Sequence, residues 1–431
     1  MASCAPSLKQ VVEACCPDEF IRETAREVGA VKRQRKVRIL ALFWTLVFGA
    51  GEGARTLTSL RQAYQNACGV TIASSAFQGR FTEALAKLFR AAVERAVQTL
   101  AEPLTGLEGR LGAFLDLVAV DSTVLRLPDL LAAKFPGCRT NQSKAALKVN
   151  VITSVGAVAP RRVKITSERH SESKMMTGGK WMAGRLLLFD LGYFGYRLFR
   201  RIAKNAGFFV SRLKENANPR IVENLRPCRG QSIDITGHRL RTVLGQLQRQ
   251  VIDCLVEVKV PLRSYNGASH SVLETFRVVG LLNDQTGCYH LYITNVSHET
   301  LSAEDIARVY GCRWEIELFF KELKGSYHLA DLPSQNVHAI QTLIYASILT
   351  LVASRKLLTA MRRYRSLAPS RTPERRWARC FRRLMEPLLR MICNPLCSAV
   401  RKEIRLLLDV LAKEMVDPNA SRARNLGICR S

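Results

Sequence analysis

The chain has 431 residues, of which 65 are Lys or Arg and 36 are Asp or Glu, so its formal net charge is +29. A hydrophobic fraction of 47% supports a substantial folded core and excludes an intrinsically disordered chain. At about 150 residues per domain, this length corresponds to two or three domains. The basic balance favours a polyanionic partner, most commonly nucleic acid, over a basic protein without such a partner.

The 13 cysteines are scattered and show none of the paired spacings of a zinc site, which favours reduced thiols in a cytosolic protein. The N-terminal segment lacks the basic and apolar parts of a signal peptide. The apolar runs at 39–50 and 339–353 are too short to cross a bilayer. We therefore expect no membrane partner.

Residues 1–110 are predicted to be helical. The basic cluster Lys32–Arg38 precedes an apolar helix at 39–48, and further helices are predicted at 59–67 and 77–100. Helices that carry basic residues and are separated by short breaks are typical of a helix-turn-helix DNA-binding module. An ordinary helical bundle fits the same pattern equally well.

Residues 111–214 are predicted to form a mixed α/β sheet. Strands are predicted at 114–120, 148–155, 162–166, 185–189 and 208–213, and a helix at 195–205. The first and fourth strands are apolar throughout, which is typical of strands buried on both faces. This order predicts a three-stranded meander followed by a β-α-β unit.

The remainder of the chain contains a strand-rich segment and a basic helical segment. Residues 215–300 include three runs rich in β-branched and aromatic residues, at 251–260, 273–282 and 288–296. The C-terminal part is predicted to be helical. Residues 355–431 carry 19 basic and 6 acidic residues, so that 19 − 6 gives a net charge of +13 in this segment.

A helix predicted over 302–324 has an unusual polar pattern. Ser302 and Asp305 form a capping box at its start, and Gly325 is its stop signal. Four polar residues share an arc of about 60° on this helix, namely Tyr310, Arg313, Glu317 and Lys324. The neighbouring apolar face, which we expect to pack on the sheet, consists of Ile316, Phe319, Phe320 and Leu323. The polar stripe can border a site at the end of the sheet, although a solvated face with an i,i+4 ion pair has the same spacing.

Two aspartates follow apolar strands. Asp121 closes the strand predicted at 114–120, and Asp190 closes the strand predicted at 185–189. Ligands of α/β sheets gather beyond the carboxyl ends of the strands. Two carboxylates on neighbouring strands repel each other unless a cation lies between them, and Mg²⁺ prefers such oxygen ligands. Glu317 would complete this metal site, although each aspartate alone fits a turn or a helix cap equally well.

The run from Tyr310 to Lys324 matches the pattern Y-x2-R-x3-E-x6-K and resembles the signature of the DDE transposases of insertion-sequence family four. The stretch Asp190–Phe194 resembles the second catalytic block of that family, and Val120–Thr123 resembles its first block. The three blocks occur in the order of the family, with the strand-rich segment between the second and the third. The resemblance covers residues 115–325 well.

The resemblance implies an α/β fold in which an RNase H-like mixed-sheet catalytic core is interrupted by a β-strand-rich insertion and flanked by helical regions. The implied boundaries are 1–110 for a helical N-terminal domain that binds the transposon end, 111–214 for the first part of the core, 215–300 for the insertion, 301–335 for the catalytic helix that completes the core, and 336–431 for a basic helical region that contacts DNA or dimerises.

The resemblance also implies the roles of individual residues. The implied ligands of two Mg²⁺ ions, for which Mn²⁺ would substitute, are Asp121, Asp190 and Glu317. The implied contacts to DNA phosphates are Tyr310, Arg313 and Lys324. The implied activity is cut-and-paste transposition, by metal-dependent strand cleavage at the element ends and strand transfer to target DNA. The implied partners are double-stranded DNA and a second copy of the chain in a homodimer, in the bacterial cytoplasm at the nucleoid.

Two other functions fit the same residues. One is a catalytically silent DNA-binding regulator derived from a transposase, and the other is a host DNA nuclease of the same fold. All three acidic residues and the four-residue signature are present, which favours the active enzyme over the silent regulator. Short inverted repeats flanking the gene would distinguish a transposase from a host nuclease.

Overall fold

The computed structural model describes residues 8–31, 37–49, 56–100, 107, 109–138, 143–156, 159–170, 176–226, 234–247, 249–262 and 270–418. Most of the basic cluster Lys32–Arg38 therefore lies outside the described residues. Nine of the described cysteines have free thiols. Cys312 is disulfide-bonded, so the expectation of reduced thiols is wrong at this position.

The secondary structure divides into helical ends and a strand-rich middle. The helices are α1 (Leu8–Glu13), α2 (Asp18–Glu27), α3 (Ile39–Phe48), α4 (Leu57–Cys68), α5 (Ser74–Gln78), α6 (Glu83–Leu100), α8 (Tyr196–Lys204), α9 (Leu240–Leu244), α10 (Ala303–Gly311), α11 (Trp314–Ser326), α12 (Val337–Tyr364), α13 (Glu374–Cys393) and α14 (Ser398–Glu414). The strands are β1 (Asp116–Leu127), β2 (Ala145–Ser154), β3 (Ala159–Ser167), β4 (Arg185–Phe189), β5 (Phe208–Arg212), β6 (Arg220–Asn224), β7 (Val251–Pro261), β8 (Ser271–Asn283) and β9 (Cys288–Thr294).

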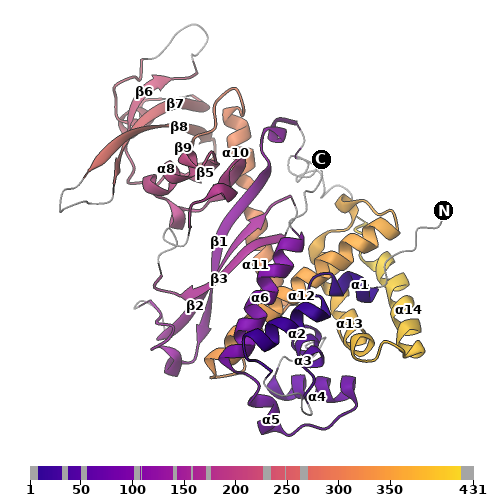
Figure 1. The fold of residues 1–431 in the computed structure, drawn as a ribbon. Coiled ribbons are helices and arrows are strands. Elements are labelled where there is room, and N and C mark those ends of the chain that lie inside the picture. Colours follow the sequence, from indigo (N-terminus) through magenta and orange to yellow (C-terminus); the bar gives the residue numbers. More distant parts are fainter. Residues whose placement is uncertain are drawn as a thin grey trace.

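The described strands form a nine-stranded sheet in the order β3-β2-β1-β4-β5-β9-β8-β7-β6. Strands β1, β2 and β3 are an antiparallel meander, whereas β4 pairs parallel with both β1 and β5. The predicted meander and β-α-β unit are therefore confirmed, and the fold is mixed α/β. Strand β9 pairs antiparallel with β5, so β6–β9 extend the same sheet, as the upper left of Figure 1 shows.

Side chains alternate between two cores on the two faces of the sheet. On β1, Leu117 contributes to the larger core and Val118 to the smaller one; on β4, Leu186 and Leu187 divide in the same way. The larger core is covered by α6 on β3, by α11 on β1 and by α10 on β5. The smaller core is covered by α8, which packs against β5 and β7.

Helices from both ends of the chain pack together into one helical body, formed by α1–α6 and α12–α14 (Figure 1). Helix α6 packs along α12, and α3 and α4 pack against α13. Helix α12 is long and apolar enough to cross a membrane by length and composition, but 83% of its apolar window is buried inside the protein. Core packing therefore accounts for its apolar sequence.

Buried polar contacts fix α11 to the helical body. Glu322 Oε2 on α11 accepts a hydrogen bond of 2.7 Å from Arg355 Nη2 on α12, and these side chains are 2% and 4% exposed. Tyr327, which directly follows α11, donates from Oη to Ser354 Oγ at 2.8 Å. Charges removed from water are tolerated only as a pair. The position of α11 against α12 therefore depends on both partners.

We expect Arg355→Met to lower the free energy of unfolding by about 3–5 kcal/mol, because the variant leaves the Glu322 carboxylate buried without its cation. The double variant Glu322→Leu with Arg355→Met should recover most of this loss, since no charge then remains buried. Denaturant unfolding followed by circular dichroism measures both effects.

Arg90→Ala serves as the control for this experiment. Arg90 forms an i,i+4 ion pair with Glu94, and both side chains are more than half exposed. Its loss should cost only about 0.3–0.5 kcal/mol. If Arg355→Met cost no more than Arg90→Ala, the buried pair would not be what holds α11.

Candidate active site

The two aspartates of the sequence motifs lie side by side on the sheet. Strands β1 and β4 are parallel, and Val120 is paired with Phe189. Asp121 and Asp190 are the next residues of these two segments. In addition, Leu117, Ala119 and Asp121 have the same parity on β1, as Leu186, Leu188 and Asp190 have along β4. Both aspartates therefore belong to the larger-core face, which α10 and α11 cover.

The prediction that β1 ends at residue 120 is wrong. Strand β1 continues to Leu127, because it pairs with β2 along this stretch, Asp121 opposite Val151. Only β4 ends at the predicted point, and Asp190 follows its last residue. Beyond Val120, β1 has lost β4 as a neighbour, and from Thr123 onward buried residues alternate with partly buried or exposed ones. The apolar run therefore marks where the pairing with β4 ends.

A third acidic residue of β1 is excluded from this site by its parity. Asp116 precedes Asp121 by five residues, so it belongs to the opposite face. There it forms an ion pair of 2.7 Å with Arg161 and accepts a hydrogen bond of 2.8 Å from Ser154 Oγ. The expectation that Asp116 does not share the site of Asp121 is confirmed by these separate contacts.

The single helix predicted over 302–324 is divided into α10 and α11. The capping box of Ser302 and Asp305 is confirmed at the start of α10. At the junction, the amides of Cys312 and Arg313 bond to carbonyls three residues back rather than four. Such tighter turns interrupt an α-helix, and Gly311 has a low helix propensity. The four signature residues therefore do not share the arc of about 60° expected for one continuous helix.

The division of the helix places the signature residues on different elements. Tyr310 is near the end of α10, Arg313 is at the junction, Glu317 is in the first turn of α11, and Lys324 is exposed in its last turn. The predicted apolar face is confirmed, because Ile316, Phe319, Phe320 and Leu323 are all buried in the larger core. Lys324 has no described contact with the other three signature residues.

Arg313 connects the polar groups of this region. Its Nη2 donates to Glu317 Oε1 at 2.7 Å, and its guanidinium lies 5.7 Å from the centre of the Tyr310 ring. Burial lowers the pKa of Arg313, but the bond to Glu317 and the neighbouring Tyr310 and Asp190 outweigh that effect and raise it. Arg313 therefore remains a cation beside the carboxylates of Asp190 and Glu317.

Tyr310 carries a buried donor without a partner. Its side chain is 8% exposed, and its Oη, like Arg313 Nε, has no hydrogen-bond partner among the described residues. Burial raises the pKa of Tyr310 to about 12, a shift that Arg313 opposes and Asp190 supports. The phenol is therefore protonated at neutral pH and can donate a hydrogen bond. Two unpaired buried donors beside carboxylates fit the recognition of an anionic group such as a phosphate.

Arg212 is a candidate residue that the sequence analysis missed. It is the last residue of β5, and its neighbour Ser211 is paired with Phe189, so Arg212 lies beside Asp190 at the ends of the parallel strands. Its charge also lowers the pKa of Tyr310. The available signal was the change from apolar to polar residues at Ser211 and Arg212, within the strand predicted at 208–213.

The three carboxylates are not assembled as a metal site in the described part of the chain. No group of three or more His, Cys, Asp or Glu residues there could hold a metal ion. Glu317 is instead paired with Arg313, and Asp121 Oδ1 accepts a hydrogen bond of 2.7 Å from the amide of Ser122. The ligand set of Asp121, Asp190 and Glu317 stays a prediction.

Comparison with known proteins identifies the class of this chain. Residues 112–353 match the family model described as the transposase DDE domain. This match spans more than half of the chain, and the chain therefore belongs to the DDE transposase family. The resemblance seen in the sequence motifs is confirmed.

Several transposases are similar to this chain. The transposase for insertion sequence element IS1151 of Clostridium perfringens is 23% identical over 74% of each chain. The transposase for IS231F of Bacillus thuringiensis subsp. israelensis is 20% identical over 80% of this chain and 78% of its own. Among solved structures, piggyBac transposase in a synaptic complex with hairpin DNA covers 95% of this chain and 85% of its own, with 11% identity and a TM-score of 0.48.

We expect Tyr310→Phe to leave the free energy of unfolding unchanged or to raise it by up to about 1 kcal/mol, because it removes a buried hydroxyl without a partner. Tyr327→Phe is the matched control, since it removes a buried hydroxyl that donates to Ser354. The control should cost about 1 kcal/mol. Equal losses for both variants in denaturant unfolding would show that the Tyr310 hydroxyl is satisfied in the free protein.

Proposed function

We propose that this protein is the transposase of an insertion sequence and that it moves its element by cut-and-paste transposition. It cleaves DNA strands at the element ends and joins the released ends to target DNA. The observation that carries the proposal is the pairing of β1 with β4, which sets Asp121 beside Asp190 on the face covered by α10 and α11. The names of the relatives with similar sequences support the insertion-sequence assignment.

The proposed catalytic core is RNase H-like and comprises residues 111–214 and 301–335. Its support is the strand arrangement, an antiparallel meander of β1–β3 followed by β4 and β5 parallel to β1. Residues 215–300 are proposed as an insertion, since β6–β9 join this sheet only through the β5–β9 pair. The flanking helical regions, 1–110 and 336–431, are proposed to bind DNA and to dimerise.

Asp121, Asp190 and Glu317 are proposed to hold two Mg²⁺ ions, with Mn²⁺ as a substitute. The donors fit this role chemically, because carboxylate oxygens are hard ligands and both aspartates belong to one face of the sheet. When bound, the metal activates the attacking oxygen and stabilises the leaving oxygen of a phosphodiester. Glu317 Oε1 accepts a hydrogen bond from Arg313 in the structure, so the guanidinium and a metal ion would compete for this oxygen.

Tyr310, Arg313 and Lys324 are proposed to hold the DNA phosphates near the cleaved bond, together with Arg212. A guanidinium released from Glu317 can donate two parallel hydrogen bonds to a phosphate. The neutral Tyr310 hydroxyl can donate one more, because its raised pKa keeps it protonated. The excess of 13 positive charges in residues 355–431 would neutralise further phosphates along the duplex. We also propose a cytoplasmic location at the nucleoid, where the DNA substrate lies.

The first test is cleavage of linear DNA that carries the presumed element ends, with Mg²⁺, with Ca²⁺ and with EDTA. We expect the wild type to cut at the element boundary only with Mg²⁺ or Mn²⁺. Asp121→Asn, Asp190→Asn and Glu317→Gln should each abolish cleavage and leave end binding nearly unchanged, because each removes a proposed metal ligand and keeps the side-chain shape.

Glu315→Gln is the control for Glu317→Gln, because both lie in the first turn of α11. It should cleave at the wild-type rate. Cleavage by Glu317→Gln near the wild-type rate would refute its assignment as a ligand. Binding to the ends without cleavage under any metal would instead favour the catalytically silent regulator.

Arg313→Ala should weaken cleavage and also reduce the salt dependence of end binding. Each phosphate contact contributes about 0.9 to the slope of log affinity against log salt concentration, so the slope should become smaller by about 1. Fluorescence anisotropy over a series of salt concentrations measures this slope. An unchanged slope would mean that Arg313 only pairs with Glu317 and does not contact a DNA phosphate.

A further inference from the structure

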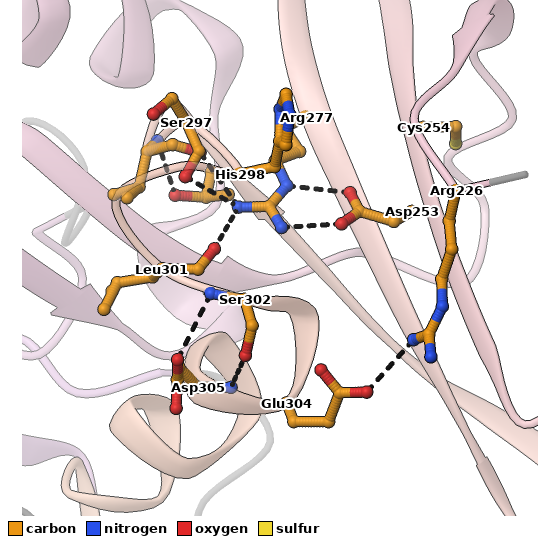
Figure 2. Close-up of polar contacts among 12 residues, drawn as sticks. Arg226, Asp253, Cys254, Arg277, Ser297, His298, Leu301, Ser302, Glu304 and Asp305 are labelled. Atoms are coloured by element: carbon orange, nitrogen blue, oxygen red, sulfur yellow. Dashed lines mark hydrogen bonds and ion pairs between the residues drawn. The ribbon is translucent and has the colours of Figure 1, made fainter. Parts of the chain in front are cut away.

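A buried arginine lies where the extension of the sheet meets the start of α10 (Figure 2). Arg277 of β8 donates from Nε and Nη2 to the two carboxylate oxygens of Asp253 on β7, at 2.7 and 2.6 Å. The two side chains are 3% and 8% exposed. A bidentate pair of this kind fixes the plane of the guanidinium as well as its position.

The remaining terminal nitrogen of Arg277 holds a turn of the main chain. Nη1 donates to the carbonyl oxygens of Val296, Ser297 and Leu301, at 3.2, 3.1 and 2.8 Å. These residues belong to the turn between β9 and α10. Figure 2 shows Ser297 and Leu301 on one side of the guanidinium and Asp253 on the other. Buried carbonyl oxygens need a donor, and Arg277 donates to three of them in this turn, in addition to the amide of Leu301, which donates to Ser297 O.

Helix α10 begins where this turn ends. The amide of Asp305 donates to Ser302 Oγ at 3.1 Å, and the amide of Ser302 donates to Asp305 Oδ2 at 3.2 Å. Glu304 forms an ion pair of 3.0 Å with Arg226, which follows β6 (Figure 2). The first turn of α10 is thus attached twice to the segment 215–300, once through the Arg277 turn and once through Arg226.

We propose that Arg277 is a positioning residue for DNA strand cleavage. It sets the start of α10, and α10 connects that position to Tyr310 and to the junction at which Arg313 donates to Glu317. The connection is short and stiff, because α10 is one nine-residue helix without an internal break. The proposal rests on the proposed transposase function and assigns to the strand-rich segment a part in assembling the site.

A merely structural role for Arg277 has different consequences. Loss of a buried ion pair that only stabilises the fold lowers stability, end binding and cleavage together. Loss of a positioning contact lowers cleavage while the protein stays folded and still binds DNA. The variants must therefore remove the hydrogen bonds from Arg277 to the turn without leaving an unpaired charge in the core.

The central variant is Asp253→Leu with Arg277→Met in the full chain. It replaces the buried ion pair by apolar side chains and removes the Arg277 donor from the three carbonyl oxygens of the turn. Arg277→Lys is the conservative variant, since it keeps a cation beside Asp253 and can still donate to the turn. Arg200→Gln is the matched control, because Arg200 on α8 pairs with Glu274 of the same strand β8 and has no described contact with the turn.

Thermal melting and end binding are measured on each variant, and two further readouts are added. The first is the rate of Mg²⁺-dependent cleavage at the element ends. The second is hydrogen–deuterium exchange of the backbone amides of 302–306, which does not require activity. For the double variant we expect cleavage to fall by about 10–100-fold, the size of effect that a small misplacement of reacting groups produces. Exchange should be faster and end binding close to wild type, while the melting temperature falls but stays above the assay temperature, because buried carbonyl oxygens lose a donor.

Arg277→Lys should restore a part of the cleavage rate, and Arg200→Gln should match the wild type in both readouts. Wild-type cleavage and exchange in the double variant would overturn the proposal, as would parallel losses of cleavage, binding and melting temperature. If the wild type cleaved no DNA, the proposed transposase function would be refuted. Unchanged amide exchange at 302–306 in the double variant would separately refute the positioning of α10 by Arg277.

Discussion

The parallel pairing of β1 with β4 is the constraint on which the site depends. It brings two carboxylates to adjacent positions on one face of the sheet, where like charges repel. Arg313, between α10 and α11, interacts electrostatically with Asp190, and Arg212 lies beside Asp190 at the end of β5. The placement of both helices on this face follows from the same sheet, because their apolar residues fill its larger core.

Much of this arrangement could be predicted from the sequence because it depends on local periodicity. Apolar runs located the strands, and parity along β1 separated Asp116 from Asp121. The break between α10 and α11 could not be predicted, since three-residue hydrogen bonding at the junction leaves the apolar spacing of Ile316 and Leu323 intact. The length of β1 and the place of Arg212 depend on which strands are neighbours, which spacing along the chain does not reveal.

The continuity of the sheet links the two halves of the molecule. Strand β9 is hydrogen-bonded to β5 on one side and to β8 on the other, so the segment 215–300 is joined to the core by main-chain pairing. Arg277 adds a side-chain connection from β8 to the start of α10. The segment between the second and third sequence motifs is therefore attached to both of the elements that it separates.

Helix α11 connects the sheet to the helical body within one continuous hydrophobic core. Its apolar face fills the core under the sheet, while Glu322 is buried against Arg355 in the helical body. Glu317 lies only five residues from that pair on the same helix. In a random-mutagenesis screen for lost transposition, inactive variants should therefore map to the interior of α12 and α13 as densely as to the motifs, although those helices contribute no signature residue.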